Sequence, residues 1–356
     1  MTEVMHDRPT PFLLVDADVL EANVTAMSVF ARERDLALRP HAKTHKSPSV
    51  AALQSAAGAT GLTVATVGEA EIFVDAGVED LFLAYPIWVD AAKGARLRAL
   101  SARARLTLGI DSVEGARALA AQLRGARVLV EVDSGQHRSG IDPTAAGDLA
   151  DAATHAGLDV GGVFTFPGHS YAPGAQAEVA AQEAAALRTA AASLSAHGIE
   201  PTVVSGGSTP SVRATDSGVL TEIRPGVYVF GDAQQWELAT TTPDRIALTC
   251  LATVVSHSGG NVVLDSGSKA LGADRSGWAS GHGRLLDHPD ARVPSLSEHH
   301  AVVSWNSAAP LPELGSRLRV VPNHVCTAVN LADELVVVRR GGVVDVWPVA
   351  ARGANT

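Results

Sequence analysis

Short apolar runs alternate with Ala-rich segments along the first two thirds of the chain. The runs have the length of buried strands, and segments such as residues 17–34, 112–123 and 175–197 are long enough for three or more helical turns. Eight such strand–helix units are typical of a (β/α)8 barrel, and a doubly wound sheet is the alternative, although no G-x-G-x-x-G follows the first strand. The predicted barrel strands are residues 12–15, 38–42, 62–66, 81–85, 105–110, 128–132, 160–166 and 202–205.

The pattern changes near Thr241, after which apolar runs separated by turns predict strands and the helical period almost disappears. The sequence therefore predicts an α/β fold with two domains: a (β/α)8 barrel over residues 10–240 and an all-β domain over residues 241–356, on which residues 1–9 could pack. Residues 272–294 are rich in Gly, Asp and His and are expected to form a loop or lid. The predicted strands of the β domain are residues 247–256, 261–265, 300–305, 318–321, 334–338 and 342–347.

Composition and charge narrow the classes of partner. Hydrophobic residues make up 46% of the chain and charged residues 19%, the balance of an ordinary globular protein. A net charge of -10 and a pI near 5.7 disfavour nucleic acid and anionic membranes as main partners. The two cysteines do not suggest a disulfide framework, and neither a signal peptide nor a membrane span is evident. We expect a soluble, cytoplasmic protein.

A basic triplet marks the end of the second predicted strand. On an extended strand Arg39, His41 and Lys43 would share one side, at a strand-to-helix turn where α/β folds place reactive groups. A partly desolvated lysine beside Arg39 would have its neutral amine favoured, as imine formation requires. Lys46 lies past the strand and is expected to point to solvent. A solvated edge strand with basic side chains is the alternative interpretation.

Small residues after the last predicted barrel strand indicate an anion site. Residues 205–210, Ser-Gly-Gly-Ser-Thr-Pro, would let backbone N–H groups approach a phosphate, and residues 224–228 could complete the cradle. A Gly-Gly turn without function is the alternative. Arg138 and Tyr171 follow the sixth and seventh predicted strands, where each could reach into the mouth of the barrel.

A possible metal pair lies in the β domain. His324 and Cys326 are two residues apart, so on an extended strand both would face one way, and both residue types bind Zn²⁺. Two protein ligands do not close a structural site, so such a metal would keep positions open for water or substrate. A chance His-x-Cys is the alternative.

Taken in order, residues 41–46, 133–140, 168–171, 205–210 and 324–326 resemble the D-serine dehydratase and D-threonine aldolase family. These enzymes are relatives of alanine racemase with fold-type III pyridoxal phosphate binding, and the resemblance covers roughly residues 10–335. It implies a cofactor-bearing barrel, a β domain and a site completed at a homodimer interface. The implied metal ligands are His324 and Cys326, with Zn²⁺ expected and Mn²⁺ possible, and the predicted cofactor-binding residues are Lys43, His41, Arg138, Tyr171, Ser205, Gly206, Gly207, Ser208, Arg224, Gly226 and Val227.

Within that set the resemblance implies distinct roles. Lys43 would bind the cofactor aldehyde covalently, and Arg138 would contact the phenolic oxygen of the cofactor. The sequence departs from the family at three positions. Thr327-Ala328 replaces the common Pro-Thr, Phe166 is apolar where relatives often carry a polar residue, and Arg224 is the third. Arg224 is more similar to alanine racemase, where the matching arginine meets the pyridine nitrogen.

The resemblance implies a pyridoxal phosphate- and metal-dependent lyase that acts on β-hydroxy-D-amino acids. We favour a D-serine dehydratase that yields a 2-oxo acid and ammonia, with Lys43 as the base. An aldolase for D-threonine or 3-hydroxy-D-aspartate is the alternative, with His45 as a candidate base for the β-hydroxyl. A racemase would need a tyrosine from the β domain, yet Tyr85, Tyr171 and Tyr228 all fall in the predicted barrel. A non-catalytic cofactor carrier would not need the β domain, and Lys269 has no assigned role.

Overall fold

The structure is a computed structural model that describes residues 8–305 and 310–356. The chain divides into two compact units, each assembled from separate segments. We call described residues 27–43, 54–226 and 354–356 the parallel unit, and described residues 8–26, 44–53 and 227–353 the antiparallel unit. Most of segment 1–9, which was expected to pack on the β domain, lies outside the described residues. Within the described chain, no helix combines the length and apolar character needed to cross a bilayer.

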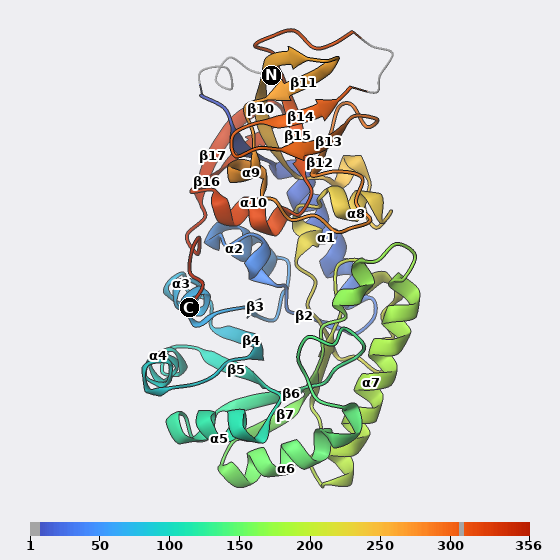
Figure 1. The fold of residues 1–356 in the computed structure, drawn as a ribbon. Coiled ribbons are helices and arrows are strands. Elements are labelled where there is room, and N and C mark those ends of the chain that lie inside the picture. Colours follow the sequence, from blue (N-terminus) through green and yellow to red (C-terminus); the bar gives the residue numbers. More distant parts are fainter. Residues whose placement is uncertain (1–7, 306–309) are drawn as a thin grey trace. The chain divides into compact units, whose positions relative to one another are not determined.

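The parallel unit is built on one eight-stranded sheet in which all neighbouring strands run parallel (Figure 1). An isolated bridge between His41 and Thr63 lies beside the two end strands, and the Thr63 N–H donates to the Pro40 carbonyl at 2.8 Å. The arrangement confirms the α/β class and is consistent with a (β/α)8 barrel. In spatial order the strands are β2 (Ala37–Leu38), β9 (Glu222–Ile223), β8 (Val203–Gly206), β7 (Asp159–Phe164), β6 (Arg127–Glu131), β5 (Arg105–Ile110), β4 (Asp80–Pro86) and β3 (Leu62–Val64).

Helices follow the strands as the Ala-rich segments predict. The side chains of Thr66, Asp90 and Ser112 accept backbone N–H groups and so cap the helices after β3, β4 and β5. Phe82 and Phe164 pack edge to face at 4.9 Å, and with Leu129 they form a buried apolar cluster of the sheet. The helices of this part of the chain are α1 (Ala17–Arg32), α2 (Pro48–Ala56), α3 (Val67–Asp75), α4 (Ala91–Ser101), α5 (Val113–Gln122), α6 (Ala146–Ala156) and α7 (Gln176–Ala196).

One predicted barrel strand belongs to the other sheet, and one strand of the parallel sheet was not predicted. Residues 12–15 were expected to open the barrel, but β1 (Phe12–Asp16) lies between β10 and β16 in the antiparallel unit. It is flanked on both sides there, so its run of buried apolar residues looks the same as that of a parallel barrel strand. The true eighth parallel strand is β9, whose two residues are too few to give an apolar pattern.

The antiparallel unit holds a nine-stranded sheet in which only the β1–β16 pairing, among the described residues, is parallel. β10 pairs with both β15 and β11, so part of the sheet forms a closed ring. The strands predicted after residue 241 are confirmed, while β12 and β13 correct the loop expected at 272–294. In spatial order the strands are β11 (Asn261–Leu264), β14 (Ala301–Ser304), β13 (Arg292–Leu296), β12 (Gly283–Leu285), β15 (Arg317–Pro322), β10 (Leu248–Ser258), β1, β16 (Glu334–Arg339) and β17 (Gly342–Pro348).

The antiparallel unit also contains three short helices, α8 (Ala233–Glu237), α9 (Ser268–Leu271) and α10 (Val325–Leu331). None of them was predicted, because helices this short show little periodicity. Tyr228 belongs to this unit and is buried, which corrects the expectation that all tyrosines lie in the barrel.

Candidate active site

Lys43 lies on a 3-10 turn and not on a strand. β2 ends at Leu38, and Ala42–Thr44 form the turn, so the expected shared face of Arg39, His41 and Lys43 does not exist. The Lys43 Nζ lies 5.3 Å from the centroid of the Phe166 ring, and the Arg138 guanidinium carbon lies 5.3 Å from the same centroid. Two of the predicted residues, from loops after different strands, therefore meet at Phe166.

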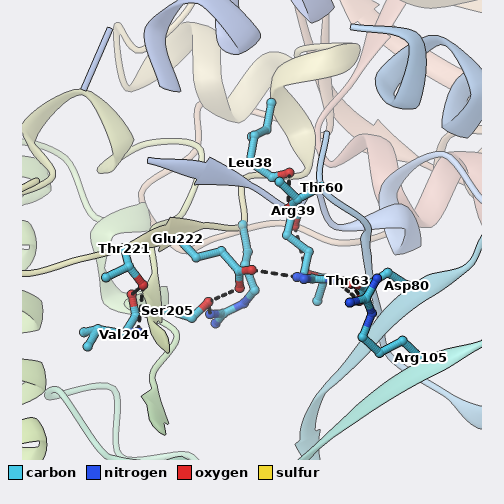
Figure 2. Close-up of polar contacts among 11 residues, drawn as sticks. Leu38, Arg39, Thr60, Thr63, Asp80, Arg105, Val204, Ser205, Thr221 and Glu222 are labelled. Carbon is cyan, nitrogen blue, oxygen red and sulfur yellow. Dashed lines mark hydrogen bonds and ion pairs between the residues drawn. The ribbon is translucent and has the colours of Figure 1, made fainter. Parts of the chain in front are cut away.

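Arg39 belongs to a separate buried network (Figure 2). Its Nε donates to the Glu222 carboxylate at 2.7 Å, and its NH1 donates to the Asp80 carboxylate at 2.6 Å. Burial lowers the pKa of Arg39, but the two carboxylates outweigh this effect and the net pKa is raised. The charge of Arg39 is thus compensated by two acids, and the effect of Arg39 on the Lys43 amine stays a prediction.

Arg224 continues this network inside the sheet. It is fully buried, its NH1 donates to the Ser205 hydroxyl at 2.5 Å, and its NH2 donates to the Thr165 carbonyl at 2.6 Å. The Ser205 hydroxyl in turn donates to Glu222 at 2.6 Å. Burial lowers the pKa of Arg224 more than the nearby carboxylates raise it. The Ser205 hydroxyl is thus engaged by two side chains, and both terminal nitrogens of Arg224 already donate within the parallel unit.

The glycine-rich segment forms a tight turn after β8. Gly207 has a φ of +79°, a left-handed conformation that favours glycine, and its N–H donates to the Glu183 carboxylate at 2.6 Å. The Ser208 hydroxyl is hydrogen-bonded to the Ser170 hydroxyl at 2.7 Å. The 3-10 turn Gly168–Tyr171 carries both Ser170 and Tyr171, so the turn after β7 is tied to the turn after β8.

The segment that carries Arg138 is closed at its base by a bridge between Val132 and Ile141. Inside it the Ser139 hydroxyl donates to Glu131 at 3.0 Å. Glu131 is only 2% exposed, and its burial raises the pKa of the carboxyl to about 7, although Ser139 and Arg138 act in the opposite direction. Sequence reasoning missed Glu131, because a single acid at the end of an apolar run has no distinctive spacing.

These features fit pyridoxal phosphate. Lys43, Arg138, the Gly206–Gly207 turn and Arg224 follow β2, β6, β8 and β9, so all lie at the carboxyl ends of parallel strands. The amine of Lys43 can bind an aldehyde, and small residues let the turn after β8 approach a phosphate group closely. His41 accepts the Lys43 N–H at its Nδ1 at 3.4 Å, and Gly226 and Val227 lead into the 3-10 turn Val227–Val229.

His324 and Cys326 lie together in the antiparallel unit. Contrary to the expected strand, His324 is the residue before α10 and Cys326 lies in its first turn. The His324 Nδ1 lies 3.3 Å from Asp232, whose fully buried carboxylate also accepts the Val325 N–H at 3.2 Å. Burial lowers the pKa of His324, but Cys326 and Asp232, both hydrogen-bonded to it, outweigh this and raise the net pKa.

This donor set fits a divalent metal with open positions. A carboxylate behind a histidine is the usual outer partner that orients a metal-binding imidazole, and the thiol of Cys326 is a preferred Zn²⁺ ligand. In the described part of the chain no cluster of three or more His, Cys, Asp or Glu could hold a metal, so the pair would leave positions for other ligands. Sequence reasoning missed Asp232, although an Asp that caps α8 could have suggested a fixed carboxylate.

Three further residues singled out in the sequence, His45, Lys46 and Lys269, lie in the antiparallel unit. His45 is fully buried, and its Nδ1 accepts the Ser47 N–H at 3.1 Å. Lys46 is 5% exposed and donates to the Ala351 carbonyl, so the expectation that it points to solvent is wrong. Lys269 forms an exposed ion pair with Glu298 at 2.7 Å.

Comparison with known proteins decides the family. Residues 15–234 match the alanine racemase N-terminal domain, and residues 247–338 match a putative serine dehydratase domain. D-threonine aldolase from Arthrobacter sp. is 36% identical over 97% of this chain and 93% of its own length. The chain belongs to the alanine racemase-like, fold-type III pyridoxal phosphate family. Relatives of this family with at least 30% identity over nearly the whole chain include two aldolases and a dehydratase, all of them lyases.

Two further relatives support this membership. The structure of D-threonine aldolase from Filomicrobium marinum superposes with a TM-score of 0.88 at 33% identity, covering 98% of this chain and 97% of that one. D-threo-3-hydroxyaspartate dehydratase from Delftia sp. HT23 is 34% identical over 98% of both chains. A mutant of that dehydratase in which alanine replaces a cysteine has a structure in the metal-free form, with a TM-score of 0.89.

Proposed function

We propose that this protein is a pyridoxal phosphate- and metal-dependent lyase that dehydrates β-hydroxy-D-amino acids, such as D-serine, to a 2-oxo acid and ammonia. The meeting of Lys43 and Arg138 at the Phe166 ring, at the carboxyl ends of the parallel strands, is the observation that carries the proposal. The similarity to D-threo-3-hydroxyaspartate dehydratase supports the substrate class.

Lys43, Arg138 and the Gly206–Ser208 turn would hold the cofactor. When bound, it would withdraw electrons from Cα of the attached amino acid, and a divalent metal would polarise the β-hydroxyl. Once released from the cofactor, the Lys43 Nζ would be a free amine and could take the proton from Cα as a general base. The two cations at Phe166 favour an anionic ligand there.

His324 and Cys326 would hold the metal, and Asp232 keeps the imidazole oriented. A cysteine ligand favours Zn²⁺ over the harder Mn²⁺. Replacement of Cys326 by alanine should remove bound zinc, measured by metal analysis of the purified protein, while the absorbance of bound pyridoxal phosphate stays. The matched control is Cys250→Ala, which changes a cysteine buried in β10 and should leave zinc bound. Zinc retained by the Cys326→Ala variant would contradict the assignment.

A product assay tests the reaction. Purified protein is incubated with D-serine, D-threonine and D-threo-3-hydroxyaspartate, and 2-oxo acid, ammonia and glycine are measured. A dehydratase yields equal amounts of 2-oxo acid and ammonia, loses activity in EDTA and regains it with Zn²⁺. Glycine without ammonia would overturn the dehydratase, also with 3-hydroxyaspartate, whose aldol cleavage gives glyoxylate as a 2-oxo acid. Absorbance of bound cofactor near ~420 nm without turnover of any D-amino acid would instead indicate a cofactor carrier.

Aldol cleavage to glycine and an aldehyde is the second candidate, and the 36% identity to D-threonine aldolase over nearly the whole chain favours it. It needs a base for the β-hydroxyl proton, for which His45 is the candidate. A His45→Gln variant that keeps cofactor and metal but loses glycine formation would support this role. The homodimer that the family resemblance implies stays a prediction, and light scattering of the purified protein measures it.

A further inference from the structure

Glu183 lies under the glycine-rich turn, and no step proposed above uses it. It is carried by α7, is completely buried, and accepts the Gly207 N–H at its Oε1 at 2.6 Å. A Cβ added to Gly206 would lie 2.3 Å from the same Oε1. The approach of Glu183 therefore explains why residue 206 is glycine, and the left-handed φ of +79° explains residue 207.

The carboxyl of Glu183 is only half satisfied. Within the described part of the chain its Oε2 has no hydrogen-bond partner. The charged group that acts on it is Arg224, whose terminal nitrogens donate to Ser205 and Thr165. Burial raises the pKa of Glu183 to about 7, although Gly207 and Arg224 act in the opposite direction. Glu183 can thus change its charge near neutral pH.

We propose that Glu183 is a positioning residue for phosphate binding, which holds the Gly207 amide from within the fold and takes up a proton from solvent when a phosphate monoester binds to the turn. This inference rests on the proposed cofactor site. The Gly207 N–H is already donated to Glu183, so an anion at the turn would have to engage Ser208, whose amide and hydroxyl are hydrogen-bonded to Ser211 and Ser170. A negative carboxylate behind the turn repels an arriving dianion, whereas the neutral acid keeps the turn in place without that repulsion.

Proton uptake is measurable without catalysis. Pyridoxine 5′-phosphate carries the phosphate but no aldehyde, so it binds without reaction at Lys43. Calorimetric titration of cofactor-free protein at pH 8, in two buffers with different ionisation enthalpies, gives the number of protons taken up on binding. Pyridoxine, which lacks the phosphate, is the ligand control. Glu178→Gln removes an exposed acid from the same helix and is the protein control.

Wild-type protein and the Glu178→Gln variant should take up more protons than Glu183→Gln, by roughly half to one proton per phosphate bound, and pyridoxine should show no such difference. Equal uptake in all three proteins would overturn the inference. If Glu183→Gln does not fold, the wild-type affinity for pyridoxine 5′-phosphate still tests it. That affinity should fall by up to about tenfold per pH unit above pH 7, and an affinity constant from pH 7 to 9 would overturn the inference.

A failure of the proposed function gives a different result. Wild-type protein that binds neither pyridoxine 5′-phosphate nor pyridoxal phosphate has no cofactor site, and the role of Glu183 falls with it. Binding of both compounds with proton uptake unchanged in Glu183→Gln leaves the cofactor site standing and rejects only the role of Glu183.

Discussion

The two units hold their candidate functional groups in different ways. In the parallel unit the groups come from turns after several strands. A chain of polar contacts from Arg39 through Glu222 to Ser205 links β2, β9 and β8 (Figure 2), and Arg224 donates to Ser205 in turn. In the antiparallel unit the candidate metal pair comes from the start of α10 and depends on a single buried acid, Asp232. The first arrangement is distributed and the second is local.

This difference predicts different consequences of substitution. Loss of a buried charge in the distributed network leaves its partners uncompensated, so folding should suffer. Loss of a group from the local pair should change metal affinity with little effect on folding. The Lys43 Nζ lies near the Phe166 ring, and because Lys43 is the proposed cofactor-binding amine and base, its replacement should affect chemistry first.

The largest expected effect is that of Lys43→Ala. We expect loss of product formation by at least about 10³-fold, because the variant lacks both the amine that binds the cofactor and the proposed base. Borohydride reduction followed by peptide mapping should place the cofactor on Lys43 in the wild-type protein. The control is Lys93→Ala, on α4 of the same unit, which should keep close to the wild-type rate of product formation. Cofactor mapped to Lys46 would contradict the assignment.

Arg39→Met should produce the largest loss of stability. The substitution leaves the buried acid Glu222 and the partly exposed Asp80 without their shared cation, while Asp80 keeps its ion pair with Arg105. We expect a cost near the lower end of about 3–5 kcal/mol in the free energy of unfolding. Urea denaturation measures it. Arg103→Met breaks an exposed ion pair with Asp75 and is the control, with an expected cost of at most about 1 kcal/mol. Equal costs would show that the network contributes no more than a surface pair.

The contrast also explains what the sequence could predict. Most strands of both sheets and the helices α1–α7 could be predicted, because their apolar runs are long enough to show a period. β1 was assigned to the wrong sheet because burial on both faces gives the same pattern in either, and β9 is too short to show any. The basic triplet showed the segment of interest but not its conformation. Arg39 points to acids 41 and 183 positions away, contacts that no local pattern encodes.

Asp232→Asn tests the local arrangement. The amide keeps the size of the side chain but loses the charge next to His324, and outer-partner substitutions of this kind typically cost about 10–100-fold in metal affinity. Competition with a chelator measures the affinity for Zn²⁺. Asp287→Asn, which removes an exposed acid from the same unit, should leave that affinity unchanged. A large loss of folding stability together with unchanged zinc affinity would show that Asp232 belongs to the core and not to a metal site.

Glu131→Gln should give the smallest effect, and one that depends on pH. The folded-state pKa of Glu131 is about 7, above the ordinary value of 4.5, so the folded protein favours the protonated form. Wild type therefore loses stability as the pH rises from about 4.5 to about 7, and the loss is complete above that range. Glutamine keeps an acceptor for Ser139 but never ionises. At pH 8 the variant should exceed wild type by about 1–3 kcal/mol in the free energy of unfolding, and at pH 4.5 this advantage should disappear.

Glu114→Gln, on the exposed face of α5, should show no such pH dependence. The same difference at both pH values would mean that the Glu131 carboxyl keeps an ordinary pKa and that the Arg138 loop tolerates its charge.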